Sequence, residues 1–282
     1  MESSFKKTGY LTGEFKLFHL VDQQQKRFEL HYHDFCKVLI LLQGNVSYVV
    51  EGKQYDMQPG DIILVNAGEI HRPVIHDNSP YDRIILYLSS DFFQRYRGED
   101  FDLFHCFTQG QRQHSSLLRP SDADRARLLP LENELALSCQ SRAYASGLYQ
   151  QIKTVEFMIC LNRLLVQENL SYSESVTANP VILQVMDYIR EHLCGELSID
   201  TIAAAVFLNR SYLMHLFKAE TGCTVWKYIT EKRLFAARTY IQKGLSITEA
   251  CYQSGFKNYA SFYHAYKAKY QSAPTEDLTA GD

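Results

Sequence analysis

The sequence lacks the features that mark membrane, secreted and disulfide-bonded proteins. It contains no run of about 18 consecutive apolar residues, which a membrane-spanning helix would require. Its first residues, Met1 to Lys7, hold no apolar segment of the kind found in secretory signals. Its seven cysteines are odd in number, scattered and never spaced as C-x-x-C. We therefore expect a cytoplasmic protein without a disulfide framework or a zinc site.

What the sequence does contain is enough apolar material for two domains. The chain has 282 residues, and 46% of them are hydrophobic, which fits two domains that each have a core. The net charge of −3 hides an asymmetry: residues 180–275 hold 11 Lys and Arg against 7 Asp and Glu, whereas residues 1–179 hold 18 against 22. This modest basic excess fits contact with nucleic acid about as well as it fits an ordinary solvated surface.

Short apolar runs fill the first third of the chain. They are rich in Val, Ile, Leu and Tyr, and turn-forming pairs such as Gly44-Asn45 and Pro59-Gly60 separate them. The predicted strands are Val38–Leu42, Val46–Val50, Ile62–Val65 and Ile84–Leu88. Many short strands at even spacing predict a sandwich or a barrel.

Helical patterns begin after the strands. Ser121 and Asp122 can cap one helix, and apolar residues from Ile152 to Leu165 form a stripe along a second. Residues 171–179 are Ser-rich and have no apolar period, so we interpret them as a linker. The expected organisation is therefore a first domain over 1–170, a linker over 171–179 and a helical domain over 180–282.

The helical domain contains an internal repeat. Leu197-Ser198-Ile199 and Leu245-Ser246-Ile247 lie 48 residues apart, and each opens a short helix that is followed by a turn and a longer helix. In each longer helix, apolar residues at i, i+3 and i+4 form one buried face. This is the layout of a helix-turn-helix motif. A helical solenoid is the rival interpretation, but such arrays usually need about three repeats.

The exposed faces of the two longer helices carry the candidate DNA contacts. Asn209 is a good N-cap, Gly222 lies where a C-cap belongs, and Ser246 with Glu249 forms a capping box. The first face would present Arg210, Ser211, Met214, His215 and Lys218, and the second Tyr259, Ala260, Tyr263, His264 and Lys267. Each residue alone fits a solvated helix face equally well, but two helices with the same spacing and the same kind of face favour DNA contact.

Residues 180–275 resemble the DNA-binding domain of the AraC/XylS family along their whole length. The first unit matches through LSIDTIAAAVFLNRSYLMHLFKAETG, and the second through ITEACYQSGFKNYASFYHAYK followed by Pro274. The connecting helix matches through YITEKRLFAARTYI, with Arg233, Leu234 and Ala237 at the family's R-L-x-x-A positions. The resemblance implies that two recognition helices enter successive major grooves about 34–36 Å apart. It assigns base contacts to Arg210, Ser211, Met214, His215, Tyr259, Ala260, Tyr263 and His264, and phosphate contacts to Lys218 and Lys267.

The sequence departs from this family pattern in two places. His215 and His264 occupy positions where the family usually has Arg. A neutral His offers fewer hydrogen-bond donors, which predicts lower affinity or an altered base preference. Gln271 and Ala273 replace the usual Gly and Ser before Pro274, outside the helices.

His31-Tyr32-His33, Lys37 and the stretch from Gly60 to His71 resemble the two motifs of cupin barrels. In metal-binding cupins, two His, a carboxylate and a later His hold the ion. Here Lys37 replaces the carboxylate and Asn66 replaces a Pro, and a protonated lysine repels a cation. Residues 31, 33 and 37 share one parity, which in an unbroken strand places them on one face. Metal binding and a self-satisfied polar network are two interpretations. The third, which we favour, is an organic ligand held by His31, His33, Lys37 and His71, with no metal or other cofactor.

These patterns predict an α+β fold class: an N-terminal cupin-like β-barrel with following helices, then an all-α domain in which a long helix joins two helix-turn-helix units. We expect a regulator and not an enzyme. Its partners would be double-stranded promoter DNA, a small sugar-like or carboxylate effector, RNA polymerase if it activates, and a second copy of the chain through the helices after the barrel. The alternatives are a cupin metalloenzyme, against which Lys37 argues, and a regulator whose barrel only dimerises.

Overall fold

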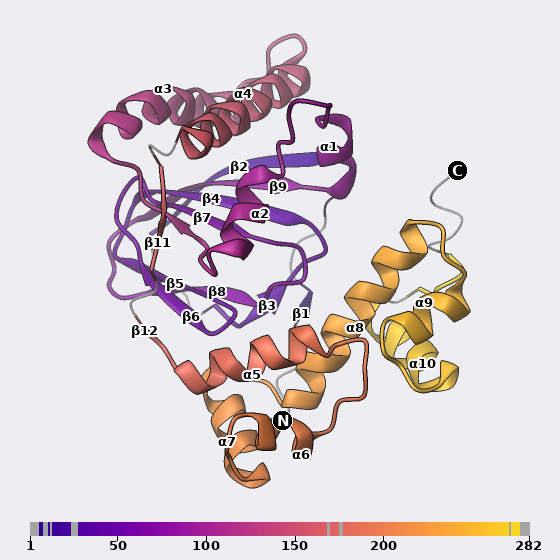
Figure 1. The fold of residues 1–282 in the computed structure, drawn as a ribbon. Coiled ribbons are helices and arrows are strands. Elements are labelled where there is room, and N and C mark those ends of the chain that lie inside the picture. Colours follow the sequence, from indigo (N-terminus) through magenta and orange to yellow (C-terminus); the bar gives the residue numbers. More distant parts are fainter. Residues whose placement is uncertain are drawn as a thin grey trace. The chain divides into compact units, whose positions relative to one another are not determined.

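The computed structural model describes residues 6–7, 11, 13–23, 28–167, 170–174, 177–270 and 272–276. The chain forms two compact units, the first ending at Ala178 and the second beginning at Asn179. Two β-sheets and several helices build the described part of the first unit, and helices build that of the second (Figure 1). The expected α+β fold class is therefore confirmed. Gln271 and residues 175–176 of the expected linker lie outside the described residues.

The two sheets of the first unit each have six strands among the described residues. Sheet A follows the order β1-β3-β8-β5-β6-β12, and sheet B the order β11-β10-β7-β4-β9-β2. The four strands predicted from the sequence lie within β4, β5, β7 and β9. In chain order the strands are β1 Lys6–Lys7, β2 Phe15–Asp22, β3 His31–Tyr32, β4 Cys36–Gln43, β5 Val46–Val50, β6 Lys53–Asp56, β7 Ile62–Val65, β8 His71–Ile75, β9 Tyr81–Leu88, β10 Leu117–Leu118, β11 Tyr172–Ser173 and β12 Thr177–Ala178.

Strand β4 is buried on both of its faces. Leu39 and Leu41 pack between the two sheets, in one core with Tyr48 of sheet A. Val38 and Ile40 point the other way and pack against helices. A strand that is covered on both sides must be apolar throughout, which explains its unbroken hydrophobic run. Lys37 is the one charged residue in this strand.

Four helices cover the outer face of sheet B. They are α1 Ser90–Arg95, α2 His105–Arg112, α3 Asp122–Ser138 and α4 Ser146–Val166, and Figure 1 shows α3 and α4 side by side above the sheet. The Ser121 hydroxyl accepts a hydrogen bond from the Asp124 amide, so the predicted cap of α3 is confirmed. Among the described residues, no helix is both long enough and apolar enough to span a membrane.

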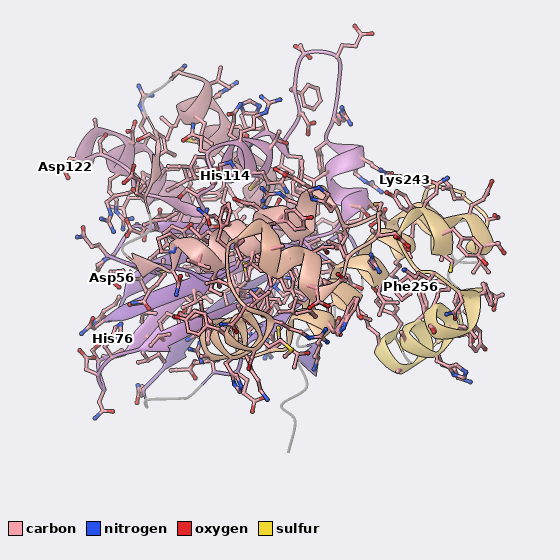
Figure 2. The ribbon with its side chains drawn as sticks, turned by 60° about the horizontal axis from the view of Figure 1, so that its bottom comes forward. Asp56, His76, His114, Asp122, Lys243 and Phe256 are labelled. Carbon is pink, nitrogen blue, oxygen red and sulfur yellow. The ribbon has the colours of Figure 1, made fainter. Side chains whose placement is uncertain are left out.

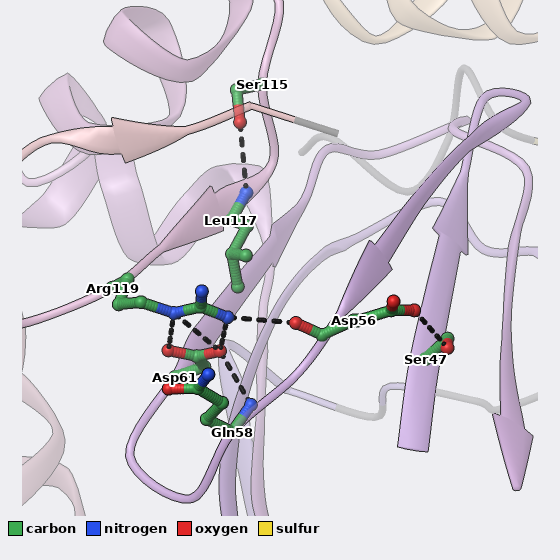
Figure 3. Close-up of polar contacts among 7 residues, drawn as sticks. All are labelled: Ser47, Asp56, Gln58, Asp61, Ser115, Leu117 and Arg119. Carbon is green, nitrogen blue, oxygen red and sulfur yellow. Dashed lines mark hydrogen bonds and ion pairs between the residues drawn. The ribbon is translucent and has the colours of Figure 1, made fainter. Parts of the chain in front are cut away.

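An ion pair fixes the segment that leads into α3 (Figure 3). Arg119 Nε lies 2.9 Å from Asp61 Oδ1, and Arg119 Nη2 lies 2.6 Å from Asp61 Oδ2 and 2.9 Å from the Asp56 carbonyl oxygen. The Asp61 side chain is buried and also accepts a hydrogen bond from the Gln58 amide. Asp61, which lies in the second cupin-like motif, therefore ties the segment before α3 to the loop between β6 and β7 through a two-pronged guanidinium–carboxylate contact.

Strand β5 separates an apolar face from a polar one. Tyr48 faces the core between the sheets. On the opposite face, Ser47 Oγ lies 2.6 Å from Asp56 Oδ1 and 2.5 Å from His76 Nε2. Asp56 and His76 are labelled near one another in Figure 2. This alternation fixes the register of the sheet, because a shift of one residue would bury Ser47 in the apolar core.

The segment expected to be a linker contributes two short strands to the first unit. β11 pairs with β10, and β12 pairs with β6. The Tyr172 hydroxyl donates a hydrogen bond to the Cys106 carbonyl oxygen, and its ring packs against the core between sheet B and the helices. Pairs of two-residue strands leave no periodic signal in the sequence, which explains why composition alone indicated a linker.

The second unit contains the predicted pair of helix-turn-helix motifs. Asn209 caps α7, Gly222 ends it in the left-handed conformation, and Ser246 with Glu249 forms the capping box of α9, all as predicted. The helices are α5 Pro180–Glu191, α6 Ile199–Ala205, α7 Arg210–Thr221, α8 Val225–Gln242, α9 Ile247–Gln253 and α10 Tyr259–Tyr270.

A buried arginine fastens the long helix α8 to the rest of this unit. Arg233 Nε donates to the Leu193 carbonyl oxygen at 2.9 Å, and its Nη2 donates to the Gly195 carbonyl oxygen at 2.8 Å. Gly255, in the turn of the second motif, lies directly against the same groups. A guanidinium keeps its charge even when it is buried, so these carbonyl partners are essential.

Replacing Gly255 by Ala should destabilise the second unit more than replacing Gly244 by Ala. Both glycines have a positive φ, +93° and +90°, so each substitution should cost about 1–2 kcal/mol of backbone strain. A Cβ at 255 would also lie 2.5 Å from the Leu193 carbonyl oxygen, whereas a Cβ at 244 would meet no atom within 4 Å. Urea unfolding, followed by the fluorescence of Trp226 in α8, measures the free energy of unfolding of both variants; Trp226 is the only tryptophan of the chain. Equal losses would contradict this packing.

Candidate functional site

Three imidazole rings meet at one edge of the space between the sheets. The ring centroids of His31 and His71 are 4.4 Å apart, those of His33 and His71 4.7 Å, and those of His31 and His33 6.3 Å. The strand that was expected to carry residues 31, 33 and 37 is interrupted, because β3 ends at Tyr32 and β4 begins at Cys36. The premise of an unbroken strand was therefore wrong, although the three histidines do gather.

Each of these rings has one nitrogen bonded to a backbone carbonyl. Nδ1 lies 2.9 Å from the Glu29 oxygen in His31, 2.7 Å from the Phe35 oxygen in His33 and 3.0 Å from the Glu69 oxygen in His71. A carbonyl oxygen can only accept, so Nδ1 carries the proton and Nε2 is left as an acceptor. His71 is fully buried, and its Nε2 has no hydrogen-bond partner among the described residues.

Lys37 lies next to this cluster, inside the barrel. Its side chain is 5% exposed, and its Nζ donates a hydrogen bond of 2.8 Å to the Tyr48 hydroxyl. The Tyr48 ring stacks with the His71 ring at a centroid distance of 6.0 Å. Burial, followed by the charge of Arg83, lowers the pKa of Lys37 to about 7. At neutral pH this amine is therefore divided between its protonated and neutral forms.

The cluster is less positively charged than the sequence suggested. Burial, with a smaller contribution from the Lys37 charge, lowers the pKa of His31 to about 4. Burial also holds the pKa of His71 well below its usual value. Contrary to what the sequence suggested, Lys37 is not fully protonated, because the cost of desolvating an ammonium favours the neutral amine. The group consists mainly of neutral donors and acceptors.

Sequence reasoning missed Tyr48, Arg83 and Tyr87. Tyr48 accepts the Lys37 hydrogen bond, the Tyr87 ring lies 5.6 Å from that of His33, and Arg83 is buried and paired with Asp22 at 2.6 Å. The sequence did contain a signal for these residues. Tyr48 lies two positions from Val46 and Val50, and Arg83 and Tyr87 each lie two positions from Ile85, so in a strand they point to the same face as these core residues. Within the described part of the chain, no three His, Cys, Asp or Glu side chains are arranged to hold a metal ion.

The second candidate site lies on helices α7 and α10. In α7, Leu213 and Phe217 are buried, and five candidate contact residues are exposed: Arg210, Ser211, Met214, His215 and Lys218. In α10, Phe262 and Tyr266 are buried, Tyr263 is half-buried, and Tyr259, Ala260, His264 and Lys267 are exposed. Arg210 Nη1 forms an ion pair of 2.8 Å with Asp200 of α6. Each helix therefore has one face in the core and one face open to a partner.

Comparisons with known proteins agree with both halves of this description. Residues 17–146 match the family model of the AraC-like ligand binding domain, and residues 202–280 match that of a helix-turn-helix domain. The HTH-type transcriptional activator RhaS of Enterobacter sp. (strain 638) is 25% identical over 254 residues, covering 89% of this chain and 88% of that protein. RhaS of Escherichia coli (strain SMS-3-5 / SECEC) is 24% identical over 254 residues, which again cover 89% of this chain and 88% of that protein. A structure of ToxT from Vibrio cholerae covers 95% of this chain and 98% of its own, with 15% identity and a TM-score of 0.37.

The two family matches and the two kinds of site define a class of protein: a DNA-binding transcription regulator that carries a ligand-binding domain. The chain belongs to the AraC/XylS family of these regulators.

Acidification should destabilise the first unit through its buried histidines. In the unfolded chain His31 takes up a proton at about pH 6.5, whereas in the folded chain it does so only near pH 4. The contribution of the neutral His31 to the free energy of unfolding is therefore fully present above about pH 6.5. It is lost as the pH falls toward 4, by up to about 3 kcal/mol. Calorimetric unfolding of the full chain at several pH values across this range measures the slope of stability against pH.

Replacing His31 by Gln should flatten this slope. Replacing His114 by Gln is the matched control, because His114 is exposed. A slope that is the same in both variants would mean that the His31 ring is solvated.

Proposed function

We propose that this chain regulates transcription in response to a small organic effector, sugar-like or a carboxylate, bound by His31, His33, Lys37 and His71. The observation that carries the proposal is the buried His71 Nε2, an acceptor without a partner among the described residues. Leaving such a group unsatisfied costs about 1–3 kcal/mol. A ligand hydroxyl that donates to it recovers this cost, so the site favours a hydroxyl-bearing guest over an apolar one.

The DNA side of the proposal follows from the two exposed helix faces. Arg210, Ser211, Met214 and His215 would read bases in one major groove, and Tyr259, Ala260, Tyr263 and His264 would read bases in the next, while Lys218 and Lys267 would bind phosphates. Asp200 would hold the Arg210 guanidinium in place until DNA replaces it. The domain limits of this proposal are 1–170 for sensing and 180–282 for DNA binding.

The proposed partners extend to a second copy of the chain and to RNA polymerase. Leu148, Ile152 and Ile159 on α4 are large apolar side chains exposed at the surface, and an equivalent helix of a second copy would cover them. The relatives of this chain are named transcriptional activators, which supports activation through the polymerase. The protein would act in the cytoplasm and without enzymatic activity.

Base-facing and phosphate-facing residues should respond differently to substitution. Replacing His215 or Tyr263 by Ala should relax preference at particular base pairs, at about 1–3 kcal/mol each. Replacing Lys218 by Ala should weaken binding to every sequence and lower the salt slope by about one. Lys243, exposed at the end of α8, is the matched control for Lys218 and should change neither (Figure 2). Binding titrations on promoter and random DNA at several salt concentrations separate the two roles, and equal losses on both DNAs from all variants would refute them.

Replacing Lys37 by Met should abolish the effector response while leaving basal DNA affinity nearly intact. The matched control is Lys16→Met, because Lys16 lies exposed on β2. A thermal-shift screen against sugars, sugar acids and divalent metals comes first, since a ligand at 100 times its Kd stabilises by about 2.7 kcal/mol. The hits are then tested on a reporter promoter. An unchanged response in Lys37→Met, or a bound metal whose removal abolishes regulation, would overturn the proposal.

A further inference from the structure

The surroundings of Lys37 are unusual for a lysine. In the sheet register it lies between Val65 of β7 and Tyr87 of β9, and its side chain is almost entirely buried. Its hydrogen-bond partner is a neutral phenol, the hydroxyl of Tyr48. Among the described residues, no carboxylate forms an ion pair with Nζ. Buried ammonium groups are normally paired with a carboxylate, so this amine is poorly stabilised in its charged form.

A charged group on a neighbouring strand also lowers the affinity of the Lys37 amine for a proton. Arg83 of β9 is fixed by Asp22 at 2.6 Å and by the Tyr81 carbonyl oxygen at 2.8 Å, and its charge opposes a second charge on Nζ. The imidazoles of His31 and His71 are neutral acceptors at pH 7. Desolvation together with a nearby cation is the combination that converts a lysine into a nucleophile at neutral pH.

We propose that Lys37 binds its effector covalently and reversibly, as an imine with the carbonyl carbon of an aldehyde or ketone such as the open-chain form of a hydroxylated sugar. This inference rests on the proposed effector site and names the functional group that the site selects. Three features favour this bond over a simple ion pair: the burial of the amine, its phenol neighbour, and the lack of a carboxylate paired with it among the residues that the structure describes.

The reaction balances without an oxidant or a reductant. The lone pair of the neutral Nζ forms a bond to the carbonyl carbon, and one of its two protons passes to the carbonyl oxygen to give a carbinolamine. The nitrogen then loses its one remaining proton, which leaves with the hydroxyl as water, and a C=N double bond replaces the C=O. Burial raises the pKa of Tyr48 well above its usual value, so its hydroxyl stays protonated beside Nζ, where it can donate a hydrogen bond to the carbonyl oxygen and to the departing hydroxyl.

His71 supplies the second contact of the bound effector. Its ring lies nearly parallel to that of Tyr48 at a centroid distance of 6.0 Å, and the Tyr48 hydroxyl accepts the hydrogen bond from Lys37. A hydroxyl of the captured carbonyl compound can donate to this nitrogen, which lacks a partner among the described residues. Hydroxylated aldehydes therefore fit the site better than simple alkyl aldehydes.

Reductive trapping on the full-length chain tests the bond directly. The protein is incubated with glyceraldehyde and sodium cyanoborohydride between pH 6 and 9, and each lysine is read by peptide mass mapping. At pH 7 the neutral fraction of a lysine with a pKa near 7 exceeds that of an ordinary one by on the order of 10³. We expect Lys37 to be labelled at least about tenfold faster than the exposed lysines, gaining the mass of the probe less one oxygen, with half its maximal rate near pH 7.

The exposed lysines of the same chain are the internal control, so the result does not depend on a variant that folds. Labelling of Lys37 no faster than that of Lys16 or Lys257 would overturn the proposal. Tyr48→Phe should slow the labelling of Lys37 at least about fivefold without changing that of the other lysines. If labelling slows equally at all lysines, or does not slow at all, Tyr48 has no role in the reaction.

Glycerol, which has the hydroxyls but no carbonyl group, distinguishes this proposal from the effector site on which it rests. If glycerol and glyceraldehyde both raise the melting temperature of the chain equally and Lys37 is not trapped, the effector site stands and the imine is refuted. If Lys37 is trapped but no sugar or sugar acid changes DNA binding or reporter expression, the imine stands and the regulatory role fails.

Discussion

The burial of β4 on both faces is the constraint on which the first unit depends. Sheet A covers one face and the helices cover the other, so neither side of the strand offers water to a polar group. The only charged side chain in it, Lys37, must then find its partners inside the protein. Tyr48 provides the hydrogen bond, and the pKa of the amine falls because solvation is missing. The chemistry of the site is thus a consequence of the layer arrangement.

A different constraint governs the second unit. Two helix-turn-helix motifs keep a fixed spacing only if the helix that joins them is attached to both. Arg233 provides part of this attachment by bonding two carbonyls of the loop before α6, close to Gly255 in the turn of the second motif. The first motif has Phe207, also at positive φ, where the second has Gly255. The motifs therefore share their layout while differing in the details of their turns.

The features that could be predicted from the sequence were those with local signals. Capping residues such as Asn209 and Ser246, and the apolar stripes of α7 and α10, are encoded within a few residues of the structure they form. The strands β10, β11 and β12 were missed because two-residue strands have no period to detect. The protonation of Lys37 was also beyond the sequence, since it depends on Arg83 and on the covering layers, which are brought near only by folding.

A site whose imidazoles are neutral selects its guest by the direction of hydrogen bonds as well as by the charge of Lys37. In each imidazole of the cluster, Nδ1 is hydrogen-bonded to a backbone carbonyl oxygen. The Nε2 atom of His71 can therefore only accept a hydrogen bond. A guest without a donor at that point leaves a buried acceptor unsatisfied, and such sites reject the wrong analogue more strongly than apolar contacts do. A carboxylate guest would require the Lys37 amine to be protonated, so its affinity would weaken as the pH rises above about 7. A neutral hydroxylated guest does not require a protonated amine, so its affinity should not weaken in this way. The pH dependence of binding therefore distinguishes the two classes of effector, and it arises from the desolvation that lowers the pKa of Lys37.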